Sequence, residues 1–146
     1  MSPLSPLPRR GHTLPELTLV LIIMSLTGLV LVRQTHLILD RVEARNAVRV
    51  AGALMDRARN EAIAQQTLVS VRIDTVSGSI DLLSRTGRIA HEPVGSSHGV
   101  TLSTTRDSVT YDVRGLGYGA ANLTLLVRRG AAAESLVTSR LGRIRY

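Results

Sequence analysis

The sequence predicts an α+β fold, in which a long N-terminal helix packs on a C-terminal antiparallel β domain. Residues 33–66 contain no proline and, apart from Gly52, no internal turn signal, and small apolar residues recur there at three- and four-residue spacing. Residues 17–32 form an apolar run without ionisable side chains directly before this stretch. From Thr67 onward the apolar period changes to two, which is typical of strands. A helix followed by strands is the order of an α+β domain.

Composition limits the other possibilities. The 146 residues leave room for one domain beside a membrane segment. Because cysteine is absent, the chain has neither a disulfide framework nor a thiolate metal site. Three tyrosines are the only aromatic residues, which favours an aliphatic core and argues against base stacking on aromatic platforms. The net charge is +7, and every positive residue is arginine.

The apolar run predicts a membrane-spanning helix. Its sixteen residues extend only about 24 Å, short of the roughly 30 Å hydrocarbon core, so the span is expected to reach back to His12 and to cover residues 12–32. Arg33 follows the run where a secretory signal peptide would have a small-residue cleavage site. We therefore expect no ordinary signal cleavage after the run, and we expect Glu16 to lie in or near the membrane.

Glu16 has two interpretations. Residues 13–16, Thr-Leu-Pro-Glu, fit a capping box, with Pro15 in the first turn, where a missing N–H costs little. An ionisable group beside a bilayer is costly, however, and is a sign of function. Capping explains how the helix starts, but it does not explain why a carboxylate stands next to the membrane.

Residues 11–17, GHTLPEL, followed by an apolar helix, resemble the class III leader of type IV pilins and type II secretion pseudopilins. The resemblance implies that a prepilin peptidase removes a leader of residues 1–11 by cutting after Gly11. It also implies that the new N-terminus at His12 is methylated and that Glu16 directs assembly. The ammonium group of a neighbouring subunit would be the partner of this carboxylate, because a buried charge is tolerable only when paired.

Two positions depart from that family's pattern. His12 stands where phenylalanine is usual, and Pro15 where an aliphatic residue is usual, which bears on methylation rather than on the position of the cut. Arg9 and Arg10 favour a cytoplasmic N-terminus, although four arginines beyond the run oppose it by the positive-inside rule. The resemblance implies a single-pass protein of the inner membrane with its C-terminal domain in the periplasm, associated with a filament after assembly.

Residues 33–66 are expected to form the amphipathic half of the same helix. Its apolar stripe consists of Ala47, Ala51, Leu54, Ala58 and Ala62. This stripe is rich in alanine, so the helix can approach a sheet closely, and the face is expected to pack in the core. Arg41, Arg45 and Arg49 are expected on the opposite, solvated face.

The β domain is expected to cover residues 67–146. Val69, Val71 and Ile73 alternate with polar residues, and Ser77-Gly78 turns the chain into residues 80–84, which predicts a hairpin. The stretch 85–99, rich in glycine, serine and histidine, is expected to be an exposed loop. Further short strands are expected at residues 100–103, 109–113, 122–128, 136–139 and 143–146.

Three further segments extend the resemblance over nearly the whole chain. Residues 58–73, 109–120 and 139–146 are similar to the GspH/FimT family of minor pseudopilins and pilins. In that family a spine helix packs on a β domain outside the inner membrane, and the helices bundle as a filament core. The resemblance implies that the partners are other major and minor pilins or pseudopilins.

No motif predicts catalysis. Residues 115–120, GLGYGA, have G-x-G-x-G spacing and precede a strand, so they lack the helix N-terminus that a dinucleotide site needs and are expected to form a turn. His36, His91 and His98 show no metal-ligand spacing and are expected to be surface residues. We therefore predict neither an enzyme nor a cofactor.

The arginines at the C-terminal end have two interpretations. Residues 128–146 hold five arginines and one glutamate, a balance of +4 (5 − 1), whereas residues 67–127 are neutral. In a strand, Arg143 and Arg145 share one face about 7 Å apart and suit successive phosphates. The ending GRIR also resembles FimT-type pilins, which take up DNA. Arg128, Arg129, Arg140, Arg143 and Arg145 are therefore candidates for binding double-stranded DNA, and the alternative is an edge strand protected by charge.

These observations lead to one main hypothesis and two alternatives. The main hypothesis is a minor, GspH-like subunit of a type II secretion pseudopilus, processed by prepilin peptidase and assembled through its N-terminal helix. The first alternative is a FimT-like minor pilin of type IV pili that binds DNA for natural transformation. The second is an unprocessed single-pass membrane protein, for which Gly11 has no role.

Overall fold

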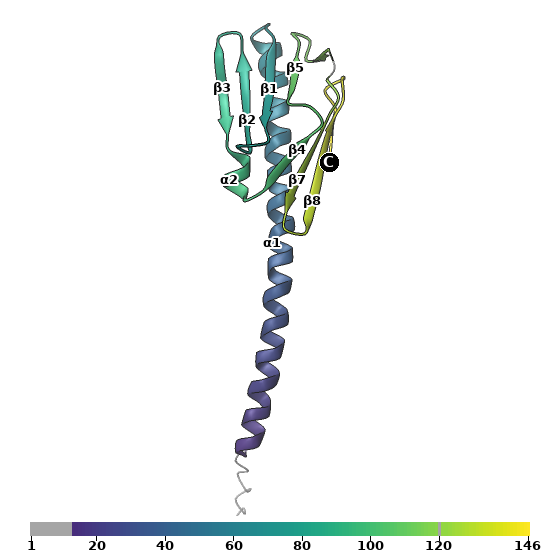
Figure 1. Ribbon diagram of the computed structural model, residues 1–146. Helices are drawn as coiled ribbons and strands as arrows, with labels where there is room; N and C mark the ends of the chain where they lie inside the picture. Colours follow the sequence, from purple (N-terminus) through teal and green to yellow (C-terminus); the bar gives the residue numbers. More distant parts are fainter. Residues whose placement is uncertain (1–12, 120) are drawn as a thin grey trace, which may run out of the picture. The chain divides into compact units, whose positions relative to one another are not determined.

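The computed structural model describes residues 13–119 and 121–146. The chain begins with a long helix, α1 (Leu14–Ala64). A first unit ends at His36, and a second, compact unit comprises Leu37–Tyr146, so that α1 belongs to both. In the second unit, the strands lie alongside the C-terminal half of α1 (Figure 1).

The N-terminal part of α1 is apolar and exposed. Its large apolar side chains between Leu14 and Leu29 are 48% to 77% exposed. By length and composition the helix is long and apolar enough to cross a membrane, and the mean hydropathy of its most apolar stretch is 2.1. The hydroxyls of Ser25 and Thr27 donate to the helix's own carbonyls at Leu21 and Ile23, at 2.8 and 3.0 Å. These polar side chains therefore need no partner from outside the helix.

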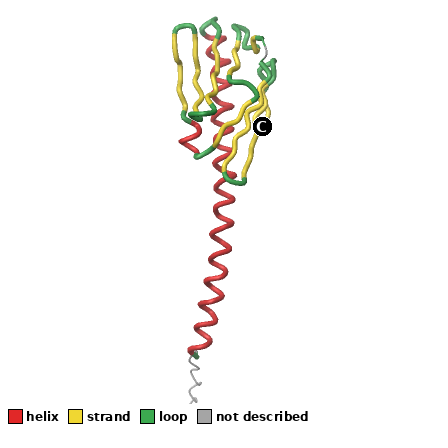
Figure 2. The backbone as a smooth tube through the Cα atoms, in the orientation of Figure 1, coloured by secondary structure: helices red, strands yellow, loops and turns green. Residues whose placement is uncertain are grey.

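The described strands form two antiparallel sheets beside α1. The elements after α1 are β1 (Val69–Asp74), β2 (Ser79–Ser84), β3 (Gly87–Glu92), α2 (Val94–His98), β4 (Thr101–Thr104), β5 (Ser108–Tyr111), β6 (Gly117–Tyr118), β7 (Leu123–Arg129), β8 (Ala132–Thr138) and β9 (Ile144–Arg145). One sheet has the order β3-β2-β1-β5-β6 and the other the order β4-β7-β8-β9. The predicted α+β class, with a long helix on antiparallel sheets, is confirmed (Figure 2).

The core lies between α1 and the inner faces of both sheets. Residues of the predicted helix stripe are buried, with Ala47, Ala51, Ala58 and Ala62 at 0% exposure and Leu54 at 9%. They join one cluster with strand residues from both sheets, among them Val71 of β1 and Leu125 of β7. Alanine carries no side chain beyond Cβ, so the helix backbone lies close to the sheets and both sheets share one core.

The prediction of an exposed loop at residues 85–99 is wrong. The segment forms β3, which pairs with β2, and the short helix α2. Val94 is fully buried, and Ile89 and Ala90 pack against the core. Of the residues that suggested a loop, His91, Ser96 and Ser97 are exposed, whereas His98 is partly buried at the end of α2.

Two smaller differences also have physical reasons. The last long strand begins at Ala132 rather than at residue 136, because alanine gives no apolar alternation to read. Within residues 115–120, expected to form a turn, Gly117–Tyr118 form the short strand β6, and the turns fall on the neighbouring Gly115 and Gly119, at φ 74° and 69°. Glycine adopts such angles at no steric cost, because it has no Cβ.

Candidate functional site

The start of α1 places Glu16 against the backbone amide of Thr13, the residue before the helix. The N–H of Thr13 donates to Glu16 Oε2 at 3.4 Å, and the Thr13 carbonyl accepts from the amides of Glu16 and Leu17 at 3.0 and 3.1 Å. This is the glutamate half of a capping box. Pro15 lies in the first turn, where its missing N–H removes no helical bond. Gly11 and His12, the predicted cleavage and methylation positions, lie outside the described residues.

The described side chains beside Glu16 are apolar and exposed. Leu14 and Leu17 are 77% and 53% exposed, and Glu16 itself is exposed. Its negative charge lies at the positive end of the helix dipole, which favours a carboxylate there. The helix start therefore places a carboxylate beside exposed leucines.

Arg145 lies in the short strand β9, and Arg143 directly precedes that strand. Ile144 between them is half-buried against the core, so both arginines point outward. They line one depression of about 340 Å³ with Val137 and Leu141. The turn before them is held by the amide of Gly142, which donates to the Ser139 carbonyl at 2.8 Å. The predicted strand 143–146 is shorter than expected, but the two arginines lie on the same side of the chain.

Arg140 adjoins this pair of arginines. It lines a second depression with Asp112, Tyr118 and Leu141, and Leu141 borders both depressions. The backbone of Arg140 is fixed, because its amide donates to Asn122 Oδ1 at 2.9 Å and its carbonyl accepts from Gly117 at 2.8 Å. Arg140, Arg143 and Arg145 therefore surround one stretch of surface, which we call the C-terminal arginine patch.

The other two predicted arginines lie elsewhere. Arg128 on β7 pairs with Ala133 on β8, whereas Arg145 pairs with Val137, four residues or about 13 Å farther along that strand. Arg129 forms an ion pair with Asp40 of α1, with Nε 3.2 Å from Oδ1, and also donates to a backbone carbonyl at His98. The five arginines do not form one patch, and Arg129 has a structural role.

A second contact ties the β domain to the same turn of α1. His98, at the end of α2, lies with Nδ1 2.8 Å from Oε2 of Glu43, and both side chains are partly buried. Sequence reasoning missed this contact and the Arg129–Asp40 pair. Their partners are 55 and 89 residues apart, and no local pattern signals such pairs.

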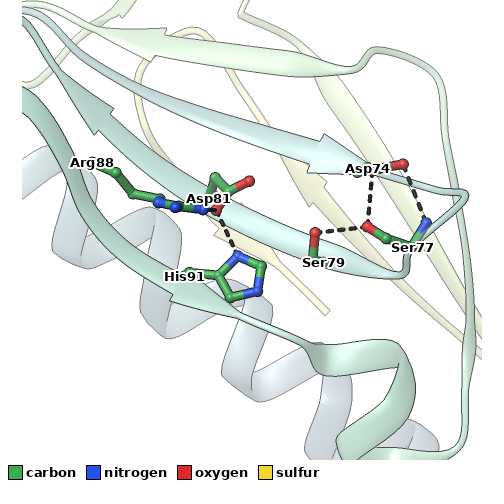
Figure 3. Close-up of polar contacts among 6 residues, drawn as sticks. All are labelled: Asp74, Ser77, Ser79, Asp81, Arg88 and His91. Carbon is green, nitrogen blue, oxygen red and sulfur yellow. Dashed lines mark hydrogen bonds and ion pairs between the residues drawn. The ribbon is translucent and has the colours of Figure 1, made fainter.

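Two separate polar clusters lie on and beside β2 (Figure 3). Asp74 accepts hydrogen bonds from the Ser77 hydroxyl at 2.8 Å and from the Val76 amide at 2.9 Å, and these bonds hold the pKa of Asp74 below its usual range. Asp81 accepts from His91 Nδ1 at 2.7 Å and from Arg88 at 3.4 Å, and the bond from His91 is the main cause that lowers the pKa of Asp81. Both carboxylates act as structural acceptors.

The described residues offer no metal centre. Within residues 13–119 and 121–146, no group of three or more His, Asp or Glu side chains is placed to hold an ion. The serines nearest to Asp81 and His91 in Figure 3 bond to each other, since Ser77 Oγ and Ser79 Oγ lie 2.8 Å apart. His91 bonds to Asp81 and to neither serine, so it orients no nucleophile among the residues in Figure 3.

No family model matches the chain, and no curated protein matches it. Solved structures do match in fold. The type IV minor pilin FimU of Pseudomonas aeruginosa PAO1, in space group P21, has a TM-score of 0.61 and 18% identity, with 72% of this chain and 88% of that chain covered. The minor pseudopilin EpsH from the type 2 secretion system of Vibrio cholerae has a TM-score of 0.57 and 16% identity, with 70% and 94% covered. The chain therefore has the fold of minor pilins and minor pseudopilins.

Proposed function

We propose that this pilin-like chain is a minor subunit of a type II secretion pseudopilus, similar to GspH. Prepilin peptidase cuts it after Gly11, and the mature subunit assembles with other major and minor pseudopilins through the N-terminal part of α1. The observation that carries the proposal is the apolar, exposed helix on a domain with the minor-pilin fold.

The exposed apolar side chains require a cover other than water. Removing a Leu, Ile or Met side chain from water is worth on the order of 1.5–3 kcal/mol, and ten large apolar side chains between Leu14 and Leu29 are about half exposed or more. Lipid covers them while the subunit is stored in the inner membrane. Neighbouring helices replace the lipid when the subunit joins a filament, so the same surface serves both states.

Glu16 is the assembly residue in this proposal. It would be the fifth residue after a cut at Gly11, and it already lies at the start of the helix beside exposed leucines. In a filament these leucines would surround the carboxylate, which is costly unless a cation is near. The N-terminal ammonium at His12 of a neighbouring subunit supplies that cation, and the β domain then faces the periplasm.

Glu16→Ala tests this role. We expect normal cleavage and membrane insertion, because the cut lies outside the helix, but at least about a tenfold loss of subunit in sheared filaments, since a buried ion pair missing one partner costs several kcal/mol. Glu92→Ala, on the outer strand β3, is the control and should assemble normally. Incorporation of Glu16→Ala at the control level would refute the pairing.

The C-terminal arginine patch supports a second candidate function, DNA binding by a FimT-like type IV minor pilin. Arg140, Arg143 and Arg145 are exposed around one surface and could contact successive phosphates without reading sequence. Arg129 is not part of this candidate site, because it pairs with Asp40. The structural neighbours include both a type IV minor pilin and a pseudopilin, so the fold does not favour either system.

A further inference from the structure

The strand β8 has an open edge along most of its length. All of its seven residues pair with β7, but on its other side only Val137 and Thr138 pair with β9. Among residues 13–119 and 121–146, none pairs with this side of residues 132–136, which therefore present backbone donors and acceptors at alternate positions. In Figure 1 this part of β8 is the outermost strand of its sheet.

A cleft adjoins this open edge. It has a volume of about 430 Å³ and is lined by Arg45, Val48 and Arg49 of α1, by Glu134 of β8 and by Tyr146. The Tyr146 hydroxyl lies over Gly52 of α1, where a Cβ atom would clash with it. One wall of the cleft is thus the helix, and the other is the strand whose edge is unpaired.

The helix wall carries arginines at a spacing that matches an extended chain. Arg45 and Arg49 line the cleft, and Arg41 lies one turn before them. All three are exposed and follow each other at four-residue intervals, which places them on one face about 6 Å apart along the axis. Alternate side chains of a strand are about 6.7 Å apart. A strand lying along this face would therefore present one side chain to each arginine.

Only some of the charged side chains on this face form ion pairs within the chain. The nearby helix acids are engaged by the β domain, Asp40 by Arg129 and Glu43 by His98. Arg45 reaches Glu134 through Nε at 2.9 Å. Within residues 37–119 and 121–146, Arg41 and Arg49 form no ion pair, so the face retains positive charge.

We propose that this cleft binds an extended segment of a partner protein that carries carboxylates at alternate positions. The segment adds a strand to the open edge of β8, and its carboxylates pair with Arg41, Arg45 and Arg49. Backbone pairing supplies affinity, and the spacing of the acids supplies specificity. A row of arginines alone would also suit phosphates, but the adjoining strand edge offers partners that only a peptide backbone uses. The proposal does not require assembly into a filament.

Peptide binding to the full chain in non-ionic detergent micelles tests the proposal. The probe is a fluorescent nine-residue peptide with glutamate alternating with valine or threonine, and the control has the same composition with its glutamates consecutive. We expect the alternating peptide to bind at least about tenfold more tightly, because only its acids face the arginines together. Equal affinities would overturn the proposal.

Backbone methylation of the peptide tests strand addition. Two versions carry N-methyl groups on alternate amides, in the odd or the even positions, and a strand that pairs at one edge uses only one of these sets. We expect one version to lose binding and the other to keep it, with slower amide exchange at residues 132–136 in the bound protein. Loss or retention of binding by both versions would contradict pairing with β8.

Charge reversal identifies the helix wall. Arg41→Glu/Arg49→Glu removes two arginines without internal ion pairs, so the fold should persist, and we expect binding to weaken at least about tenfold. Arg72→Glu/Arg85→Glu, which reverses exposed arginines in and beside the other sheet, is the matched control and should bind normally. Equal weakening by both pairs, or binding of a DNA duplex but of no peptide at the arginine face, would overturn the proposal.

Discussion

The close packing of α1 on the sheets makes Ala51 sensitive to size. Ala51 is 0% exposed in the centre of the helix stripe, whereas Ala53, two residues later, is exposed. Ala51→Leu adds three carbon atoms to a filled site, and such overpacking costs about 1–3 kcal/mol. Ala53→Leu adds the same atoms in solvent, where the difference in helix propensity is only a few tenths of a kcal/mol.

Thermal unfolding of the full chain in detergent micelles, followed by circular dichroism, measures this difference. For a unit of about 110 residues, 1 kcal/mol corresponds to roughly 4 °C, so Ala51→Leu should lower the Tm by about 4–12 °C. Ala53→Leu should leave the Tm within about 2 °C of the wild type. Equal Tm values for the two variants would refute the packing of the alanine stripe against the sheets.

Three further predictions concern the β domain. Gly117→Ala should destabilise it by more than about 2 kcal/mol in denaturant titrations, because the new Cβ would clash with the side chain of Ala121. Gly119→Ala has open space around the new Cβ and should cost only about 1 kcal/mol, from its positive φ. Asp81, whose pKa is lowered by folding, contributes stability that is present above its unfolded pKa and is lost as the pH falls through its folded pKa. The free energy of unfolding of Asp81→Asn should therefore fall less steeply as the pH is lowered. The same pH dependence as the wild type would contradict this. If the alternative DNA-binding function holds, Arg143→Ala/Arg145→Ala should make the salt dependence of duplex binding shallower by roughly one to two phosphate contacts, and an unchanged slope would exclude the two arginines.

The helix and its buried face were predictable because their signal is local. Apolar residues at three- and four-residue spacing report one helix face whatever the partner is, and Ala47 and Ala62 were accordingly assigned to the core. Arg143 and Arg145 also lie on one side of the chain, as their alternation with Ile144 predicted, although the strand itself covers only Ile144–Arg145.

The segment 85–99 was not predictable from its own composition. Strand β3 is stabilised by pairing with β2 and by the contacts of His91 and Arg88 with Asp81, and none of these is visible within its own residues. α2 is only five residues long, and its buried residue is Val94. Short elements of this kind depend on tertiary partners rather than on local propensity.

The roles of Arg129 and His98 also depended on distant residues. Nothing near Arg129 in the sequence separates it from Arg128, yet one is tied to Asp40 and the other is exposed. The count of positive charge at the C-terminal end therefore overestimated the size of the possible DNA surface. The open edge of β8 was missed for a different reason. The strand begins with two alanines, which give no apolar alternation, so its first residues were not recognised as a strand.

The N-terminus of the mature chain tests the central claim most directly. The chain is produced in membranes together with a prepilin peptidase, or with an inactive peptidase as the control, and its intact mass and N-terminal sequence are determined. The account predicts a chain that begins at His12 with a methylated amino group, and a Gly11→Val variant that keeps its leader. A wild-type chain that retains residues 1–11 in the presence of active peptidase would contradict processing as a pilin-like subunit and would leave an unprocessed single-pass membrane protein.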